Sequence, residues 1–76
     1  MDIQAGERYR HYKGKEYTIL AVARNESDPE EFLVIYRAEY DSPDFGNGCV
    51  WARPLELFNG NLDVDGKELK RFTRIE

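Results

Sequence analysis

The sequence predicts an all-β fold, namely a small five-stranded SH3-like barrel that is partly open. Short runs rich in tyrosine, valine, isoleucine, phenylalanine and threonine alternate with turns rich in glycine, proline and asparagine. A chain of 76 residues is long enough for one core only, so we expect a single domain over residues 1–76. Five short strands at this size hide their edges best by bending into a partly closed barrel.

The five strands are expected at residues 7–12, 16–24, 31–40, 49–53 and 70–75. The second and third runs are apolar at most positions, which is typical of central strands that are covered on both faces. Gly14, between Lys13 and Lys15, can take the positive φ that a tight hairpin turn requires. Residues 25–30 are expected to form a longer acidic loop between the second and third strands.

One short 3₁₀ or α turn is expected near residues 54–58. Pro54 suits a first-turn position, and Asn59-Gly60 is a stop signal. Asp65-Gly66 predicts a further hairpin turn rather than part of a calcium loop. An OB-like barrel is the alternative fold, but it normally carries a longer helix, for which the sequence offers no segment.

Composition and charge restrict the functional classes. A net charge of −4 disfavours sequence-independent binding to nucleic acid backbones, although Arg8 to Lys15 is locally basic. One cysteine, Cys49, cannot form an internal disulfide, and no zinc-ligand spacing occurs, so we expect no metal and no cofactor. No stretch has the length of a membrane span or the pattern of a signal peptide. We therefore expect a cytoplasmic protein without membrane contact, monomeric or weakly dimeric.

Catalytic motifs are absent from the sequence. Cys49 and His11 are the only Cys/His pair, and a thiolate nucleophile would need that histidine beside it in space. A structural cysteine is the simpler interpretation. An unrecognised small enzyme is therefore the third-ranked class, and no catalytic residue is assigned.

Arginine and aromatic residues form the most distinctive pattern. Arginines that interrupt apolar strands in so small a domain must reach water, a carboxylate or an anionic ligand. Stacking on core tyrosines and pairing with acids at the barrel rim is the structural alternative. The functional hypothesis is a groove for an anionic or aromatic ligand, with a nucleotide or nucleic acid ranked first and a protein peptide second. Its candidate residues are Arg10, His11, Tyr12, Tyr36, Arg37, Trp51 and Arg53.

The segments YRHYKG, VIYRAEY, VWARPLELF and VDGKELKRFTRI together resemble one family, the bacterial domain of unknown function numbered 1653. The resemblance covers residues 6–75 and implies an SH3-like β-barrel without an established activity. Three features depart from the family pattern: Asn25 replaces a frequent histidine, Lys70 replaces a frequent proline, and residues 41–48 form a longer turn. The first departure argues against a mechanism that needs two histidines.

Overall fold

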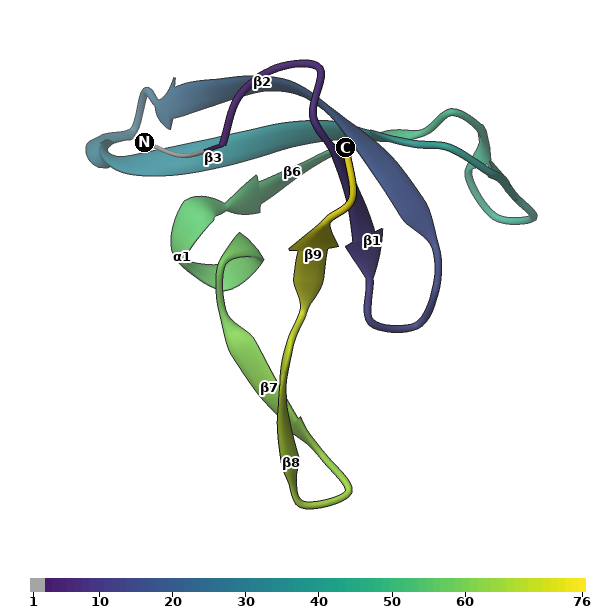
Figure 1. Cartoon of the computed structure of the whole chain (residues 1–76). Helices are drawn as coiled ribbons and strands as arrows, with labels where there is room; N and C mark the ends of the chain where they lie inside the picture. The colour runs from purple at the N-terminus through teal and green to yellow at the C-terminus, as the bar shows by residue number, and fades with distance from the viewer. Residues whose placement is uncertain (1–2) are drawn as a thin grey trace.

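A five-stranded antiparallel sheet is the framework of the protein (Figure 1). The computed structural model describes residues 3–76. In spatial order the strands are β6 (Val50–Pro54), β3 (Asp28–Ala38), β2 (Glu16–Asn25), β1 (Arg8–His11) and β9 (Phe72–Arg74). Each of the five lies within or close to a predicted run, so the predicted all-β class is confirmed.

The sheet stays open, because no backbone ladder within residues 3–76 joins β6 to β9. The short helix α1 (Leu55–Phe58), at the predicted turn, follows β6 directly and carries Phe58 under the sheet. Phe58 and Phe72 stack with ring centroids 4.2 Å apart and an interplanar angle of 8°. Aromatic packing thus spans the gap that backbone hydrogen bonds would close in a full barrel.

The β2–β3 hairpin differs from the expected longer loop. Asn25 pairs with Asp28, so only two residues form the turn and both strands extend further than predicted. The Asn25 side chain stabilises this tight turn, since its Oδ1 accepts a hydrogen bond from the Ser27 backbone N–H at 3.0 Å. The extended β3 tolerates Pro29, because β6 pairs with β3 only from Leu33 onward.

Two small hairpins extend from the sheet (Figure 1). The first joins β4 (Asp41–Ser42) to β5 (Gly46–Asn47), and the second joins β7 (Asn61–Val64) to β8 (Lys67–Lys70). The predicted Asp65-Gly66 turn is confirmed, with φ of 52° and 78°. The strands beside it were not predicted, and the strand predicted at residues 70–75 is divided between β8 and β9.

The core lies on one side of the sheet, which we call the inner face. Directly opposed residues of paired strands share a face, so the register places Tyr9 with Tyr17, and Ile19 with Tyr36, on this side. The buried residues are Ile3, Tyr9, Tyr17, Ile19, Val34, Tyr36, Ala38, Phe58 and Phe72. The described residues contain no helix that is long and apolar enough to cross a membrane.

Candidate functional site

The predicted site residues separate onto two faces of the sheet. His11 is opposite Phe72, Trp51 is opposite Tyr36, and Arg53 is opposite Val34, so these side chains share the inner face. Arg10 and Arg37 alternate with inner-face residues and lie on the outer face. The seven residues therefore do not line one groove.

The outer-face arginines are paired with carboxylates. Arg10 Nη2 lies 3.2 Å from Glu16 Oε2, and Arg37 Nη2 lies 3.0 Å from Glu39 Oε2. A hydrogen bond from Thr18, and then the Arg37 guanidinium, hold the pKa of Glu39 below its usual value. Arg10 and Arg37 thus have a structural role rather than a ligand-binding one, because they pair with acids on the sheet surface.

The predicted groove residue Tyr36 is a core residue. Only 5% of its surface is exposed, and its ring lies 5.1 Å from Tyr17 and 5.7 Å from Phe72 in edge contacts. Burial leaves little of the Tyr36 ring for a ligand. Tyr36 therefore supports the inner face by packing against Phe72 and does not itself contact a ligand.

His11 lies at the open side of the inner face. Its ring contacts Phe72 edge-on at 5.0 Å and Tyr12 at 4.5 Å. The Lys13 backbone N–H donates to His11 Nδ1 at 3.2 Å, which requires an unprotonated Nδ1. The neutral ring therefore carries its proton on Nε2, and Nε2–H is a potential donor to a ligand.

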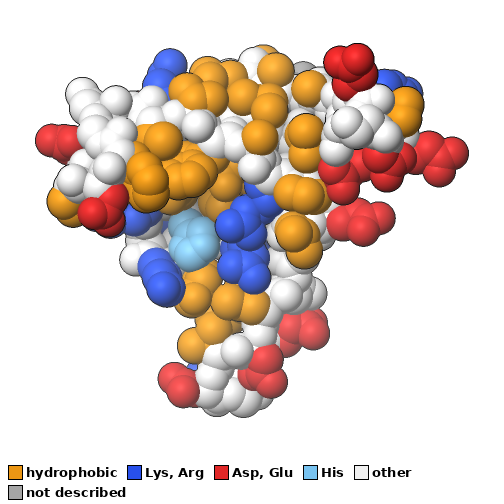
Figure 2. Space-filling view, turned by 180° about the vertical axis from the view of Figure 1, so that it is seen from behind, with side chains coloured by type: hydrophobic (Ala, Val, Ile, Leu, Met, Phe, Trp, Pro, Cys, Tyr) orange, Lys and Arg blue, Asp and Glu red, His pale blue; other side chains and the backbone are white. Residues whose placement is uncertain are grey.

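The charges of three cations act on His11. Burial, and then the charges of Arg71, Arg53 and Lys13, lower the pKa of His11 below its usual 6.5. The Arg53 guanidinium lies 5.8 Å from the Phe72 ring centroid. We call His11, Lys13, Arg53 and Arg71 the inner cationic cluster. Figure 2 shows the histidine in the middle of this face, beside Lys and Arg side chains and framed by hydrophobic ones.

Within the described part of the chain, Arg53 and Arg71 lack the carboxylate partners that Arg10 and Arg37 have. Both residues are partly buried. Within residues 3–76, neither guanidinium group has a carboxylate oxygen within 4.0 Å. Acidic side chains lie toward the margins of the face in Figure 2. Two partly desolvated guanidinium groups with free donors form a surface that favours an anion.

Arg71 belongs to the inner cationic cluster but was not among the candidate residues that the sequence suggested. Its backbone N–H donates to Gly60 O at 3.1 Å, and its carbonyl accepts from the Tyr12 N–H at 2.9 Å. These bonds fix Arg71 between the end of α1 and the end of β1. They connect residues far apart in the sequence, so no local pattern could have indicated this position.

A tyrosine pair lies next to the cluster. The hydroxyls of Tyr17 and Tyr40 are 2.8 Å apart, and Lys15 Nζ lies 4.9 Å from the Tyr40 ring centroid. Burial, and then the hydrogen bond with Tyr40, raise the pKa of Tyr17 above its usual 10.0. Tyr17 is therefore a neutral phenol at physiological pH and adds no negative charge beside the arginines.

Two clefts in the structure lie away from the cluster. A cleft of about 390 Å³ between the β2–β3 hairpin and α1 carries the carboxylates of Asp28, Glu30, Glu31 and Glu56. Another, of about 330 Å³, lies along β9. Neither includes His11, Arg53 or Arg71, and the acidic cleft would repel an anion. The candidate site is therefore an open surface and not a deep cleft. Its features are its positive charge and its exposed aromatic rings.

The Cys/His pair gains no support from geometry. Within residues 3–76, Cys49 Sγ has one hydrogen-bond partner, the Val50 carbonyl oxygen at 3.9 Å. His11 contacts Phe72, Tyr12 and the Lys13 backbone instead. No group of three or more His, Cys, Asp or Glu residues in the described chain could hold a metal ion.

The comparisons with known proteins concern the family. A family model described as "Protein of unknown function (DUF1653)" matches residues 7–74. The chain belongs to this family. A crystal structure of a DUF1653 protein from Bordetella bronchiseptica is similar, with a TM-score of 0.79 and 30% identity over 97% of this chain and 88% of that chain. No protein with curated annotation matches. The resemblance noted in the sequence is confirmed, and the family assigns no activity.

Proposed function

We propose that this DUF1653 protein is a binding module whose inner cationic cluster takes a phosphate-bearing ligand with aromatic bases, a nucleotide or a single-stranded nucleic acid. The observation that supports this proposal is the pair Arg53 and Arg71, partly buried beside His11 without a carboxylate partner among residues 3–76. The lone, unpaired Cys49 suits a cytoplasmic location, where such ligands occur.

The chemistry of the cluster suits phosphate. A guanidinium group presents parallel N–H donors that match two phosphate oxygens, and His11 Nε2–H adds a third direction. A neutral His11 adds a donor without further repulsion between cations. A bound phosphate would offset the charges of Arg53 and Arg71, so it would favour protonation of His11 and strengthen its own hydrogen bond.

The net charge of −4 limits the size of the contact. Few cations face the ligand, and the acidic hairpins would repel a long nucleic acid backbone. The proposal therefore concerns a short segment that a few contacts bind, not extended coating of a strand. A moderate dependence on salt is expected.

A peptide that adds a strand to β6 is the second candidate. β6 is an edge strand, and within the described residues its side away from β3 has no paired strand. Backbone pairing of this kind is nearly independent of salt, whereas phosphate contacts are not. Salt dependence therefore separates the two candidates.

The test is binding of pyrophosphate and of a short oligothymidylate, measured by calorimetry, to variants that each lose one arginine. Arg53→Met and Arg71→Met should both weaken binding strongly. Arg10→Met and Arg37→Met are the matched controls, because they remove the same charge from the outer face. The proposal fails if the outer-face variants weaken binding as much as the inner-face variants, or if neither probe binds.

A further inference from the structure

An exposed aromatic pair borders the inner cationic cluster. Trp51 and Phe45 are 36% and 61% exposed, and their ring centroids lie 5.0 Å apart at an interplanar angle of 82°. Phe45 comes from the turn between β4 and β5, so this hairpin brings its ring to β6. Isolated exposed apolar side chains are common, but two large rings in contact beside a cationic cluster indicate a binding surface.

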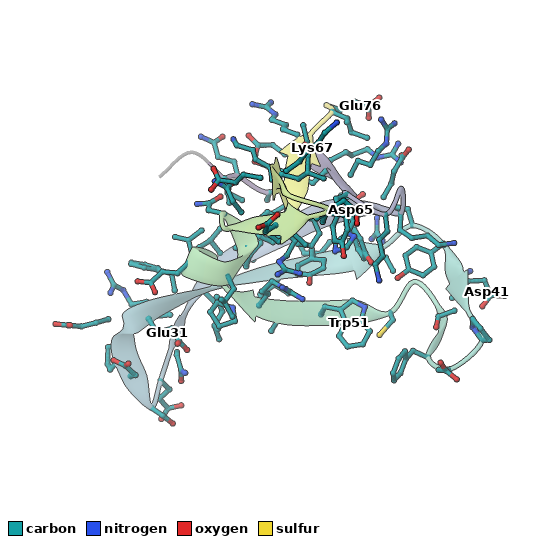
Figure 3. The ribbon with its side chains drawn as sticks, turned by 90° about the horizontal axis from the view of Figure 1, so that it is seen from below. Glu31, Asp41, Trp51, Asp65, Lys67 and Glu76 are labelled. Atoms are coloured by element: carbon teal, nitrogen blue, oxygen red, sulfur yellow. The ribbon has the colours of Figure 1, made fainter. Side chains whose placement is uncertain are left out.

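Trp51 and Arg53 lie on the same face of β6. They are two residues apart, which places them about 7 Å from each other along the strand. Their partners across the β3 ladder, Tyr36 and Val34, are both buried on the inner face. Figure 3 shows Trp51 on β6, between the end of the sheet near Glu31 and the hairpin that carries Asp41. The aromatic pair and the cationic cluster therefore form one continuous surface.

We propose that this surface binds single-stranded nucleic acid of at least two nucleotides, with one base against Trp51 and Phe45 and a neighbouring phosphate on Arg53 and Arg71. This inference deepens the proposed function and rests on it. Stacking on aromatic side chains tolerates every base, because every base has a π face. We therefore expect little sequence preference at this position.

The positive charge of Arg53 favours nucleic acid over a hydrophobic protein surface as the ligand of this site. A hydrophobic protein surface placed over Trp51 would extend over Arg53 and bury its guanidinium without a partner, which is costly. A nucleotide segment instead offers an apolar ring and an anionic group at adjacent positions. The separation of about 7 Å between Trp51 and Arg53 along β6 suits a base and the phosphate next to it.

The fluorescence of Trp51 provides the test, because it is the only tryptophan in the chain. Oligothymidylate should bind and quench this emission, whereas pyrophosphate and an abasic oligonucleotide of the same length should bind without quenching. Trp51→Ala should weaken oligothymidylate binding by roughly five- to hundredfold, measured by anisotropy of a labelled strand, and leave pyrophosphate binding unchanged. Val50→Ala, at the neighbouring outer-face position of β6, is the matched control and should change neither.

The outcomes separate this inference from the proposed function. Equal affinity for the abasic and normal strands, without quenching and without an effect of Trp51→Ala, would overturn base stacking and leave phosphate binding intact. Absence of binding by all three probes would overturn both. A dimer in sedimentation that Trp51→Ala dissolves, with no quenching by oligothymidylate, would show that a second copy covers the pair and would overturn the inference.

Discussion

Removal of both arginines of the inner cationic cluster, Arg53 and Arg71, should abolish the salt dependence of oligonucleotide binding. Each contact between a cation and a single-stranded phosphate contributes about −0.7 to the slope of log affinity against log salt. Arg53 and Arg71 supply two contacts, which gives a slope of about −1.4 and a loss of about sevenfold between roughly 50 and 200 mM salt.

The assay is fluorescence anisotropy of a labelled oligothymidylate over a series of sodium chloride concentrations. The Arg53→Met/Arg71→Met protein should bind weakly with a slope near zero. The Arg10→Met/Arg37→Met protein loses the same charge from the outer face, so it should keep the slope of the unmodified protein. A slope that survives in the inner-face variant, or one that disappears in the outer-face variant, would refute the assignment of the phosphate site.

Two further predictions concern stability. Because the folded protein holds the pKa of His11 below its usual 6.5, the unfolded chain binds this proton more tightly, and the free energy of unfolding should decrease as the pH falls through 6.5. In urea titrations between about pH 7 and 5.5, His11→Gln should reduce this decrease, and an unchanged decrease would contradict the prediction. Phe58→Ala should lower the free energy of unfolding by about 3–5 kcal/mol, because Phe58 is 1% exposed and stacks on Phe72. A loss below about 1 kcal/mol would show that this stack does not hold the open side of the sheet.

The strands of the main sheet were predictable because their signals are local. Alternation of apolar residues and turn punctuation located all five, and Pro54 with Asn59-Gly60 located α1. The β7–β8 hairpin was missed as strand because each of its strands has only four residues and all four residues of β8 are exposed, so the alternation in β7 is too short to stand out. The Asn25 turn was misjudged because the polar run at residues 25–30 also suits a longer loop, and the bond from Asn25 Nδ2 to Glu31 Oε1 at 2.9 Å forms only across the folded hairpin.

The candidate site was predictable only in part. The sequence singled out His11, Trp51 and Arg53, which the structure places on one face. It also grouped Arg10 and Arg37 with them, although their carboxylate partners on the outer face follow from strand register. Register is a long-range property, so composition and spacing could not separate the two sets of arginines.

The ring of His11 offers the most direct test of the inner cationic cluster as a phosphate site. Its pKa can be measured by NMR from the pH dependence of the ring carbon-bound protons, first without ligand and then with saturating pyrophosphate. We predict a pKa below 6.5 in the free protein, held there by burial and by Arg71 and Arg53, and a higher pKa when pyrophosphate is bound. An identical His11 pKa in the two states, in a protein that demonstrably binds pyrophosphate, would place the anion elsewhere and contradict the account.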